Sequence, residues 1–296
     1  MTEPVFLVDS SMYVFRAWHS MPDEFQDADG EPVNAVHGFT RFVLELIERQ
    51  RPARLVFAFD VALESSFRNT LYPAYKANRE PAPDQLKRQF GYCQSLCRAL
   101  GFPVLANPHY EADDLIGTAL HHVRRNGHLG LILSADKDLA QLLAQGDVQW
   151  DYARNERWGV DGVKPRYGVH AHQMADYLGL TGDAIDNIPG VPGIGAKTAA
   201  TLLGHFGSLD ALLERVAEVP FLRLRGSARH AEQLKTHRDI ALLSRQLATI
   251  ACDAPLPEDF GNGERSAVDV AGLDALFEQI RFGPLTRRRL QTAAAG

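Results

Sequence analysis

The stretch Pro4-Val5-Phe6-Leu7-Val8-Asp9 has the pattern of a buried β-strand that ends on a carboxylate. Short, unbroken apolar runs of this kind are typical of strands that are covered on both faces of a parallel sheet. Residues 54–60 repeat the pattern and also end on an aspartate, Asp60. Residues 128–135 form a third such run and lead into Asp136. We therefore predict an α/β fold with a mostly parallel central sheet and flanking helices.

Helical patterns separate these runs. Apolar spacing predicts helices over residues 39–49 and 86–100, and short strands over residues 103–105 and 148–151. Strands that alternate with helices are joined by right-handed crossovers, and ligands bind beyond the carboxyl ends of such strands. The aspartates that follow the strands are therefore expected to lie at one edge of the sheet.

The sequence Tyr110-Glu111-Ala112-Asp113-Asp114 opens another helical pattern with three acids. A single aspartate at a helix start, or after a strand, is commonly a helix cap. Three crowded carboxylates instead raise one another's pKa unless a cation lies among them. Together with the aspartates at the strand ends, this stretch predicts a site for divalent metal ions.

The second half of the chain is predominantly helical. Residues 248–252 are expected to return to the core as a strand, and residues 287–289 to form a basic tail. From these patterns we predict an α/β core at residues 1–165, which includes a basic, aromatic segment at 64–90, a helical subdomain at 166–247, and a C-terminal segment at 248–296 that packs back on the core.

Residues 190–198, Gly-Val-Pro-Gly-Ile-Gly-Ala-Lys-Thr, lead into a helix. The spacing excludes a P-loop, because Ala196 stands between Gly195 and Lys197, and a third glycine for a dinucleotide fingerprint is missing. We interpret the stretch as a tight hairpin between two helices whose N–H groups, with Lys197, bind a phosphate of the DNA backbone. The alternative is a plain helix–helix turn with a glycine cap.

Composition is that of a soluble globular protein. Hydrophobic residues make up 45% and charged residues 23% of 296 residues, and the three cysteines suit a reducing compartment. We find neither an apolar run long enough to span a membrane nor a secretion signal, so we expect a cytoplasmic protein. The net charge is −6, but if nine of the 37 acids serve a metal cluster, 28 acids remain against 31 basic residues. The rest of the surface would then be mildly basic.

A series of motifs resembles the flap endonuclease and 5′-3′ exonuclease family, most closely the 5′-nuclease domain of bacterial DNA polymerase I. The resemblance extends over about residues 5–285, and since no polymerase segment follows, a stand-alone nuclease or an excised domain is expected. The motifs are Phe6-Leu7-Val8-Asp9-Ser10-Ser11, Phe67-Arg68 with Tyr75-Lys76 and Arg79, Glu111-Ala112-Asp113-Asp114, Asp136-Lys137-Asp138-Leu139, and the segment from Gly182-Asp183 to Lys197-Thr198.

This resemblance implies a PIN-like nuclease core, a helical arch and a helix–three-turn–helix DNA-binding subdomain. It implies a monomeric, divalent-metal-dependent 5′-3′ exonuclease and flap endonuclease, which hydrolyses DNA near 5′ ends, flaps, nicks and gaps in replication and repair. The competing hypotheses are a module that binds branched DNA with weak or no catalysis, and a ribonuclease on a related α/β scaffold.

The resemblance also assigns roles to residues. Two or more Mg²⁺ or Mn²⁺ ions, about 4 Å apart, are expected to activate water and stabilise the leaving oxygen. Lys76 and Arg79 are expected to neutralise the scissile phosphate, and these two with Asp9 and Asp113 form the catalytic set. The metal ligands implied are Asp9, Asp60, Glu111 and Asp113, mainly for one ion, and Asp136, Asp138 and Asp186, mainly for the other, with Asp114 and Asp183 acting through water.

The implied DNA-binding set combines cations, aromatic rings and the glycine hairpin. Tyr72 or Tyr75 is expected to stack on an unpaired base. Ser10 and Ala135 replace glycines that are common in the family. The set comprises Arg16, Arg68, Tyr72, Tyr75, Lys76, Arg79, Gly193, Gly195, Lys197 and Thr198, and the backbone carbonyls of Ile188, Pro189, Val191 and Ile194 are expected to hold K⁺.

Overall fold

The computed structural model describes residues 3–61 and 65–295. The chain forms two compact units. Unit 1 comprises Met1–Leu63, Pro81–Ser134 and Ala251–Gly296, and unit 2 comprises Glu64–Glu80 and Ala135–Ile250. These limits differ from the predicted boundaries, because residues 64–80 and 135–165 belong to the same unit as the helical subdomain.

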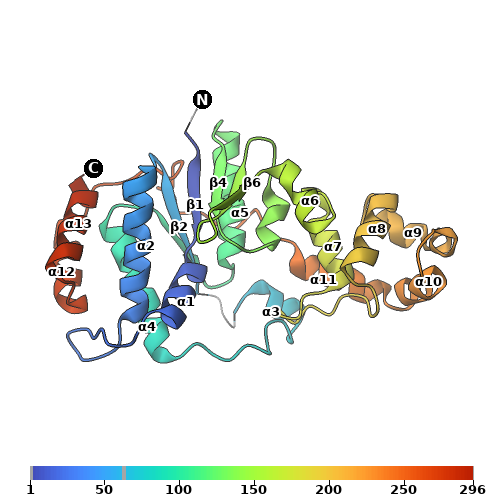
Figure 1. Cartoon of the computed structure of the whole chain (residues 1–296), viewed down its shortest axis with the longest axis horizontal. Helices are drawn as coiled ribbons and strands as arrows, with labels where there is room; N and C mark the ends of the chain where they lie inside the picture. Colours follow the sequence, from blue (N-terminus) through green and yellow to red (C-terminus); the bar gives the residue numbers. More distant parts are fainter. Residues whose placement is uncertain (1–2, 62–64, 296) are drawn as a thin grey trace. The chain divides into compact units, whose positions relative to one another are not determined.

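Unit 1 is built on a parallel sheet. The strands are β1 (Val5–Asp9), β2 (Leu55–Asp60), β3 (Val104–Asn107) and β4 (Gly130–Leu133), in the order β3-β2-β1-β4 (Figure 1). Each neighbouring pair is parallel. All of β1 is buried, which explains its unbroken apolar sequence. The predicted α/β fold with a mostly parallel sheet is confirmed.

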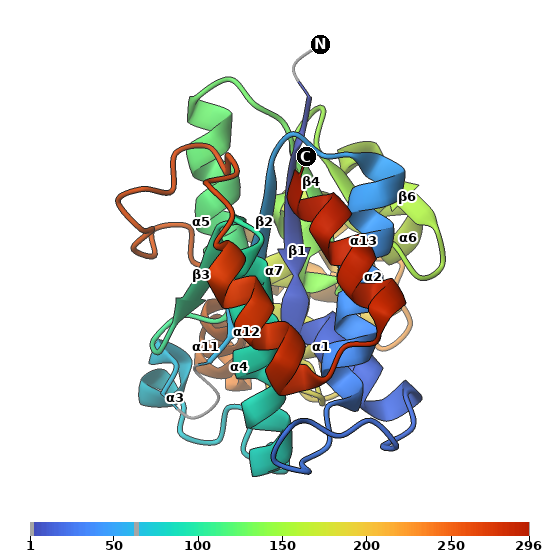
Figure 2. The same ribbon diagram turned by 90° about the vertical axis from the view of Figure 1, so that its left-hand side faces the viewer.

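Helices flank this sheet: α1 (Ser10–Ser20), α2 (Asn34–Gln50), α4 (Asp84–Ala99), α5 (Ala112–Arg125), α12 (Val270–Ile280) and α13 (Pro284–Ala295). Helix α12 packs on α4 and α13 on α2, as Figure 2 shows. The C-terminal segment therefore belongs to the core of unit 1. The predicted basic tail at residues 287–289 is wrong, because these residues lie inside α13, which buries Leu290 and Ala293.

Unit 2 contains an antiparallel hairpin of β5 (Val148–Asp151) and β6 (Glu156–Trp158). His237 separates the helices α10 (Ser227–Thr236) and α11 (Arg238–Ala248). The other elements are mostly short helices: α3 (Phe67–Leu71), α6 (Val163–Tyr167), α7 (Met174–Thr181), α8 (Ala196–Phe206), α9 (Leu209–Glu214), α10 (Ser227–Thr236) and α11 (Arg238–Ala248), with 3-10 turns at Asp138–Leu142, Val160–Gly162, Ala171–Gln173 and Val216–Phe221.

The strand predicted at residues 248–252 is absent from the described part of the chain. Side chains satisfy this backbone instead of a neighbouring strand. Arg68 donates to the carbonyls of Leu247 (2.7 Å) and Thr249 (2.9 Å), and the N–H of Ile250 donates to Gln141 Oε1 (3.0 Å). Ala248 therefore ends α11, and residues 249–252 continue the chain without joining a sheet.

Two glycines cross back to back between α7 and α8. Gly182 has φ 66° and Gly190 has φ 62°, a backbone region that L side chains rarely adopt. A Cβ atom at Gly190 would lie 2.3 Å from the backbone N of Gly182, which is far inside van der Waals contact. The hairpin therefore requires glycine at both positions.

This crossing predicts the effect of a single methyl group. Gly190→Ala should lower the free energy of unfolding by about 2 kcal/mol or more, because it adds both backbone strain and a clash with backbone. Gly204→Ala is the matched control, because Gly204 lies in α8 with no atom within 4 Å of an added Cβ. That variant should be neutral or more stable by up to about 1 kcal/mol. Urea denaturation of both variants measures the difference, and equal stabilities would show that the hairpin does not require glycine at position 190.

No helix in residues 3–61 and 65–295 is long and apolar enough to cross a membrane.

Candidate active site

In unit 1, carboxylates gather at the C-terminal edge of the sheet. Asp9 ends β1 and Asp60 ends the neighbouring strand β2. Asp9 is buried and accepts hydrogen bonds from Ser134 Oγ (2.9 Å) and the N–H of Met12 (3.4 Å). Asp60 Oδ1 accepts from the N–H of Ala112 (2.8 Å), the first residue of α5. This last bond brings the acidic start of α5 to the strand ends, as the sequence predicts.

The first turn of α5 uses its acids in different ways. Glu111 is the N-cap and forms a capping box with Asp114. Asp114 is 0% exposed, and its two oxygens accept from the N–H groups of Glu111 (3.0 Å) and Ala251 (2.8 Å). Asp114 therefore caps the helix and fixes the chain at residue 251, and its contact with a metal ion stays a prediction. Asp113 is half-buried in the same turn.

Unit 2 holds the remaining acids, and Lys137 lies among them. The N–H of Asp138 donates to Asp136 Oδ1 (2.9 Å), so the two carboxylates on either side of Lys137 belong to one turn. Lys137 Nζ donates a short hydrogen bond to Asp183 Oδ2. Burial alone would raise the pKa of Asp183, but the hydrogen bond and charge of Lys137, together with the backbone N–H groups of Ile185 and Asp186, outweigh it and lower the pKa. The sequence analysis did not assign a role to Lys137, although its position between two aspartates was a visible signal.

Asp138 has the environment expected of a cation ligand. Its Oδ1 atom is buried and has no hydrogen-bond partner within the described residues, and Lys137 Nζ lies 3.9 Å away. Burial, followed by the charge of Asp136, raises the pKa of Asp138. A buried carboxylate oxygen that repels its neighbours is stabilised by a hard cation such as Mg²⁺. The donor set of unit 2 therefore fits a divalent ion.

Lys76 and Arg79 both contact Asp186. Arg79 Nη2 forms a short ion pair with Asp186 Oδ1, and Lys76 Nζ lies 3.7 Å from Oδ2. The backbone N–H of Lys76 also donates to the carbonyl of Asp186 (3.0 Å). Lys76 has φ 55°, a left-handed conformation that costs about 1 kcal/mol for a non-glycine residue and that is common at functional sites. The two cations predicted to bind phosphate thus neutralise a predicted metal ligand.

Two residues of the same segment lie elsewhere than predicted. Tyr75 is 3% exposed and packs in a cluster with Leu178, Ile188 and Leu247, and Tyr72 lies partly buried against that cluster. A base cannot stack on Tyr75 in this position. Arg68 is also 3% exposed, and the two carbonyls described above accept its hydrogen bonds. Both side chains are buried in this structure, and their contact with DNA stays a prediction.

The predicted arch is mostly non-helical. Residue 64 of the predicted segment lies outside the described residues. From there to the start of α4 the structure shows only the short helix α3 and a series of turns. Pro73, Pro81 and Pro83 account for this, because proline lacks the N–H group that a continuing helix needs.

The glycine hairpin exposes its backbone. An added Cβ at Gly193 or Gly195 would meet no atom within 4 Å, and no side chain caps the start of α8. Lys197 is exposed and Thr198 half-buried in the first turn. The carbonyl of Ile188 accepts from the N–H of Asp183 (2.9 Å), and that of Val191 from Ile194 (3.0 Å). Since a carbonyl has two lone pairs, these bonds leave room for the predicted K⁺.

Within residues 3–61 and 65–295, no group of three or more His, Cys, Asp or Glu side chains is arranged as a ready metal shell. The contacts above give the reason, because Lys76, Arg79, Lys137 and helix N–H groups already bind the predicted ligands. Arg16 lies exposed on α1, and Ser10 is buried at its start.

Two family models together match most of the chain. Residues 4–168 match a model described as 5′-3′ exonuclease, N-terminal resolvase-like domain, and residues 169–271 match 5′-3′ exonuclease, C-terminal SAM fold.

Curated relatives are similar at the level of sequence. DNA polymerase I of Rhizobium leguminosarum is 36% identical over 291 residues, which cover 96% of this chain and 28% of that protein. DNA polymerase I of Bacillus caldotenax is 34% identical over 287 residues, which cover 95% of this chain and 32% of that protein. The chain therefore spans about a third of the length of these relatives.

Solved structures share the fold. A T5 5′-exonuclease with bound zinc has a TM-score of 0.68 at 18% identity, with 99% of this chain and 98% of that one covered. The catalytic core of Rad2 in complex with DNA substrate has a TM-score of 0.64 at 13% identity, with 99% and 92% covered. At these identities the likeness shows the fold alone.

The orphaned oxygen of Asp138 gives a prediction that needs no substrate. Asp138→Asn removes the cost of burying a carboxylate beside Asp136, so the metal-free variant should be more stable than the parent by about 1 kcal/mol. The variant should also lose most of the stabilisation that Mg²⁺ gives the parent. Thermal denaturation with chelator and with Mg²⁺ measures both effects. Asp161→Asn, at an exposed position of the same unit, is the control, and identical behaviour of the two variants would refute the prediction.

Arg68 gives a second prediction. Arg68→Met should lower the free energy of unfolding by about 2–3 kcal/mol, because two carbonyls lose the charged donor that satisfies them. Arg16→Met, which removes an exposed guanidinium from α1, should change stability by less than about 0.5 kcal/mol. Chemical denaturation of the two variants distinguishes a structural arginine from a surface one, and an unchanged stability of Arg68→Met would contradict its structural role.

Proposed function

The chain belongs to the 5′-3′ exonuclease family, and on that premise we propose that it is a divalent-metal-dependent, structure-selective nuclease that hydrolyses DNA near 5′ ends. The observation that carries the metal-dependent part of the proposal is the acidic edge of unit 1, where two neighbouring strands and the start of α5 each contribute carboxylates. The buried oxygen of Asp138 in unit 2 supports the same chemistry.

Each unit offers a set of oxygen ligands. Mg²⁺ or Mn²⁺, when bound, would supply an activated water and stabilise the leaving oxygen. In unit 1 the ligands would be Asp9, Asp60, Glu111 and Asp113, with Asp114 acting through water. In unit 2 they would be Asp136, Asp138 and Asp186, with Asp183 acting through water.

Lys76 and Arg79 would act by exchange of partners. Both now bind Asp186, and a phosphate that enters the site would compete with that carboxylate for the same cations. Release of Asp186 frees its oxygens for a metal ion, so the binding of phosphate and of metal favour each other. The proposal therefore gives the ion pairs at Asp186 a role before substrate binds.

The hairpin before α8 would hold the DNA backbone. Gly193 and Gly195 expose N–H groups at the start of a helix whose dipole favours phosphate, and Lys197 and Thr198 flank them. A K⁺ held by the carbonyls of Ile188, Pro189, Val191 and Ile194 would add positive charge there. Arg16 on α1 would be a further phosphate contact. The substrates proposed are 5′ flaps, nicks and gaps met in replication and repair by a monomer in the cytoplasm.

Cleavage of a 5′-labelled flap duplex tests this proposal. With Mg²⁺ the parent should cut near the flap junction, and with chelator it should not. Asp113→Asn should lower the cleavage rate about a hundredfold or more, because it removes a proposed metal ligand. DNA binding should be kept, because Asp113 is half-buried and its loss leaves the helix cap intact. Asp161→Asn is the matched control and should cut at the parent rate.

The other outcomes separate the competing functions. Shifted but uncut DNA in gel electrophoresis, with both Mg²⁺ and Mn²⁺ present, would establish a branched-DNA-binding module. Preferred cutting of a matched RNA strand would establish a ribonuclease. An Asp113→Asn variant that cuts at the parent rate would remove the proposed metal site of unit 1.

A further inference from the structure

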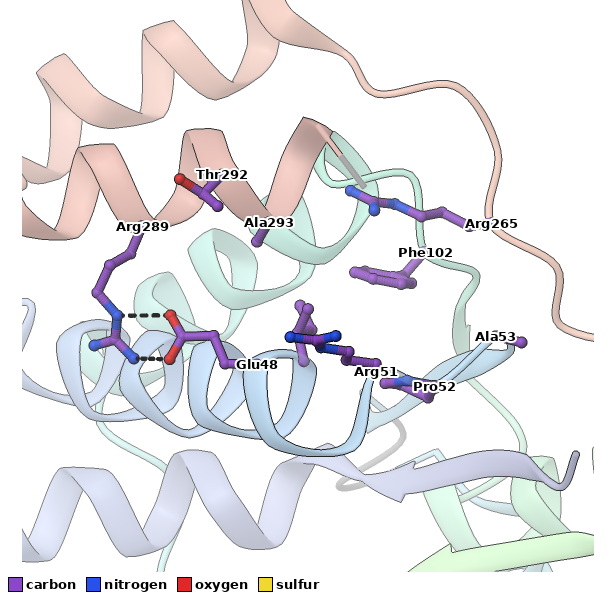
Figure 3. Close-up of a pocket in the computed structure, with 10 residues that line it drawn as sticks. Glu48, Arg51, Pro52, Ala53, Phe102, Arg265, Arg289, Thr292 and Ala293 are labelled. Atoms are coloured by element: carbon purple, nitrogen blue, oxygen red, sulfur yellow. Dashed lines mark hydrogen bonds and ion pairs between the residues drawn. The ribbon is translucent and has the colours of Figure 1, made fainter.

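Unit 1 has a pocket at the edge of the sheet away from the carboxylates. Its volume is about 420 Å³, and it lies between the end of α2, the segments that precede β2 and β3, and α13 (Figure 3). Because β2 runs for six residues between this edge and Asp60, the pocket is roughly 20 Å from the acidic edge. The lining residues are Ile47, Glu48, Arg51, Pro52, Ala53, Phe102, Arg265, Arg289, Thr292 and Ala293.

The lining carries an excess of positive charge. Glu48 is the only carboxylate in it, and Arg289 binds both of its oxygens at 2.8 Å (Figure 3). Arg265 donates to the carbonyls of Leu100 (2.7 Å) and Ala294 (3.5 Å) and pairs with no carboxylate in the described part of the chain. Arg51 likewise has no ion-pair partner among residues 3–61 and 65–295. Two guanidinium groups therefore face one pocket without a counter-charge.

Contacts hold the backbone of Arg51 and the guanidinium of Arg265 in place. Arg51 is the C-cap of α2, with φ 45° and its N–H bonded to the carbonyl of Ile47 (2.9 Å). The Arg265 guanidinium lies 4.7 Å from the centre of the Phe102 ring, and burial lowers the pKa of Arg265. Arg51 is exposed, so the unfavourable burial of an uncompensated charge falls on Arg265, and an anion in the pocket would relieve that cost.

The rest of the lining is apolar. Ile47, Pro52, Ala53, Phe102 and Ala293 offer carbon surface beside the arginines. The volume falls within the range of about 300–1,000 Å³ that is usual for sites of small organic ligands, and it is larger than a bare ion needs. The ligand that matches this lining has an anionic group for Arg51 and Arg265 and an apolar or planar body.

We propose that this pocket binds a nucleoside 5′-monophosphate, with its phosphate at Arg51 and Arg265 and its base and sugar against the apolar wall. The need for an organic anion follows from the pocket itself. The choice of a nucleotide rests on the proposed function, since stepwise 5′ cleavage of a phosphorylated strand releases such molecules. The pocket would then be a product site remote from the carboxylates.

Isothermal titration calorimetry with 2′-deoxyadenosine 5′-monophosphate tests the proposal. EDTA is present throughout, so that no metal ion bridges the nucleotide to the carboxylates. The parent should bind one equivalent with a Kd below about 1 mM. Arg51→Gln and Arg265→Gln should each weaken binding at least ~10-fold. Arg288→Gln, an exposed position of α13 outside the lining, should stay within about twofold of the parent.

Two further measurements keep the outcomes distinct. Inorganic phosphate should bind more weakly than the nucleotide, and equal affinities would overturn the nucleotide as the ligand. Arg51 is exposed, so Arg51→Gln should fold even if Arg265→Gln does not. The binding measured for Arg51→Gln is then sufficient to test the site. No saturable binding by the parent, or unchanged binding by Arg51→Gln, would overturn the site. Flap cleavage with Mg²⁺ should be unchanged in Arg51→Gln, so failure of the pocket and failure of the nuclease proposal are separate results.

Discussion

Mutual repulsion of carboxylates is the constraint on which the arrangement of the candidate site depends. Unit 1 meets it with neutral donors, because Asp9, Asp60 and Asp114 accept hydrogen bonds from Ser134 and from backbone N–H groups. Unit 2 meets it with cations, because Lys137 binds Asp183 and Arg79 binds Asp186. Asp138 Oδ1 accepts no hydrogen bond within the described residues and has Lys137 Nζ only at 3.9 Å, so the compensation is incomplete at the position where a metal ion would be most effective.

Local sequence predicted the elements of the sheet but not the roles of residues that act over long distances along the chain. Strands β1 and β2 and their terminal aspartates follow from short apolar runs, which need no knowledge of distant residues. The burial of Arg68 and Tyr75 was not predicted, because a basic, aromatic, proline-rich segment has the composition of an exposed surface. Their partners, such as Leu247, lie far along the chain, and no periodic pattern reports such contacts. Helix α13 at the C-terminus was not predicted either. Three consecutive arginines gave this segment the composition of an exposed tail, although Leu290 and Ala293 are buried.

The same difference between local patterns and long-range contacts applies to the predicted metal ligands. Residue types and their places at strand ends indicated which acids to consider, and the edge of unit 1 brings Asp9, Asp60 and the start of α5 together as expected. The donor that each carboxylate oxygen binds was not predictable, because hydrogen bonds such as that from Ala251 to Asp114 depend on the tertiary path of the chain. Sequence therefore identifies candidate ligands better than it separates ligands from caps.

That bond between Ala251 and Asp114 has a consequence for biosynthesis. Unit 1 combines three stretches of chain, and the last begins at Ala251 and supplies α12 and α13. Residues 135–250 of unit 2 are made between the second and third stretches, so the ribosome must synthesise all of them before the N–H of Ala251 can bind Asp114. Closing loops of this length is slow. Helices α2 and α4 therefore stay uncovered by α13 and α12 until the last stretch has been translated. The time during which the faces of α2 and α4 stay uncovered is thus set by the insertion of one unit within the other.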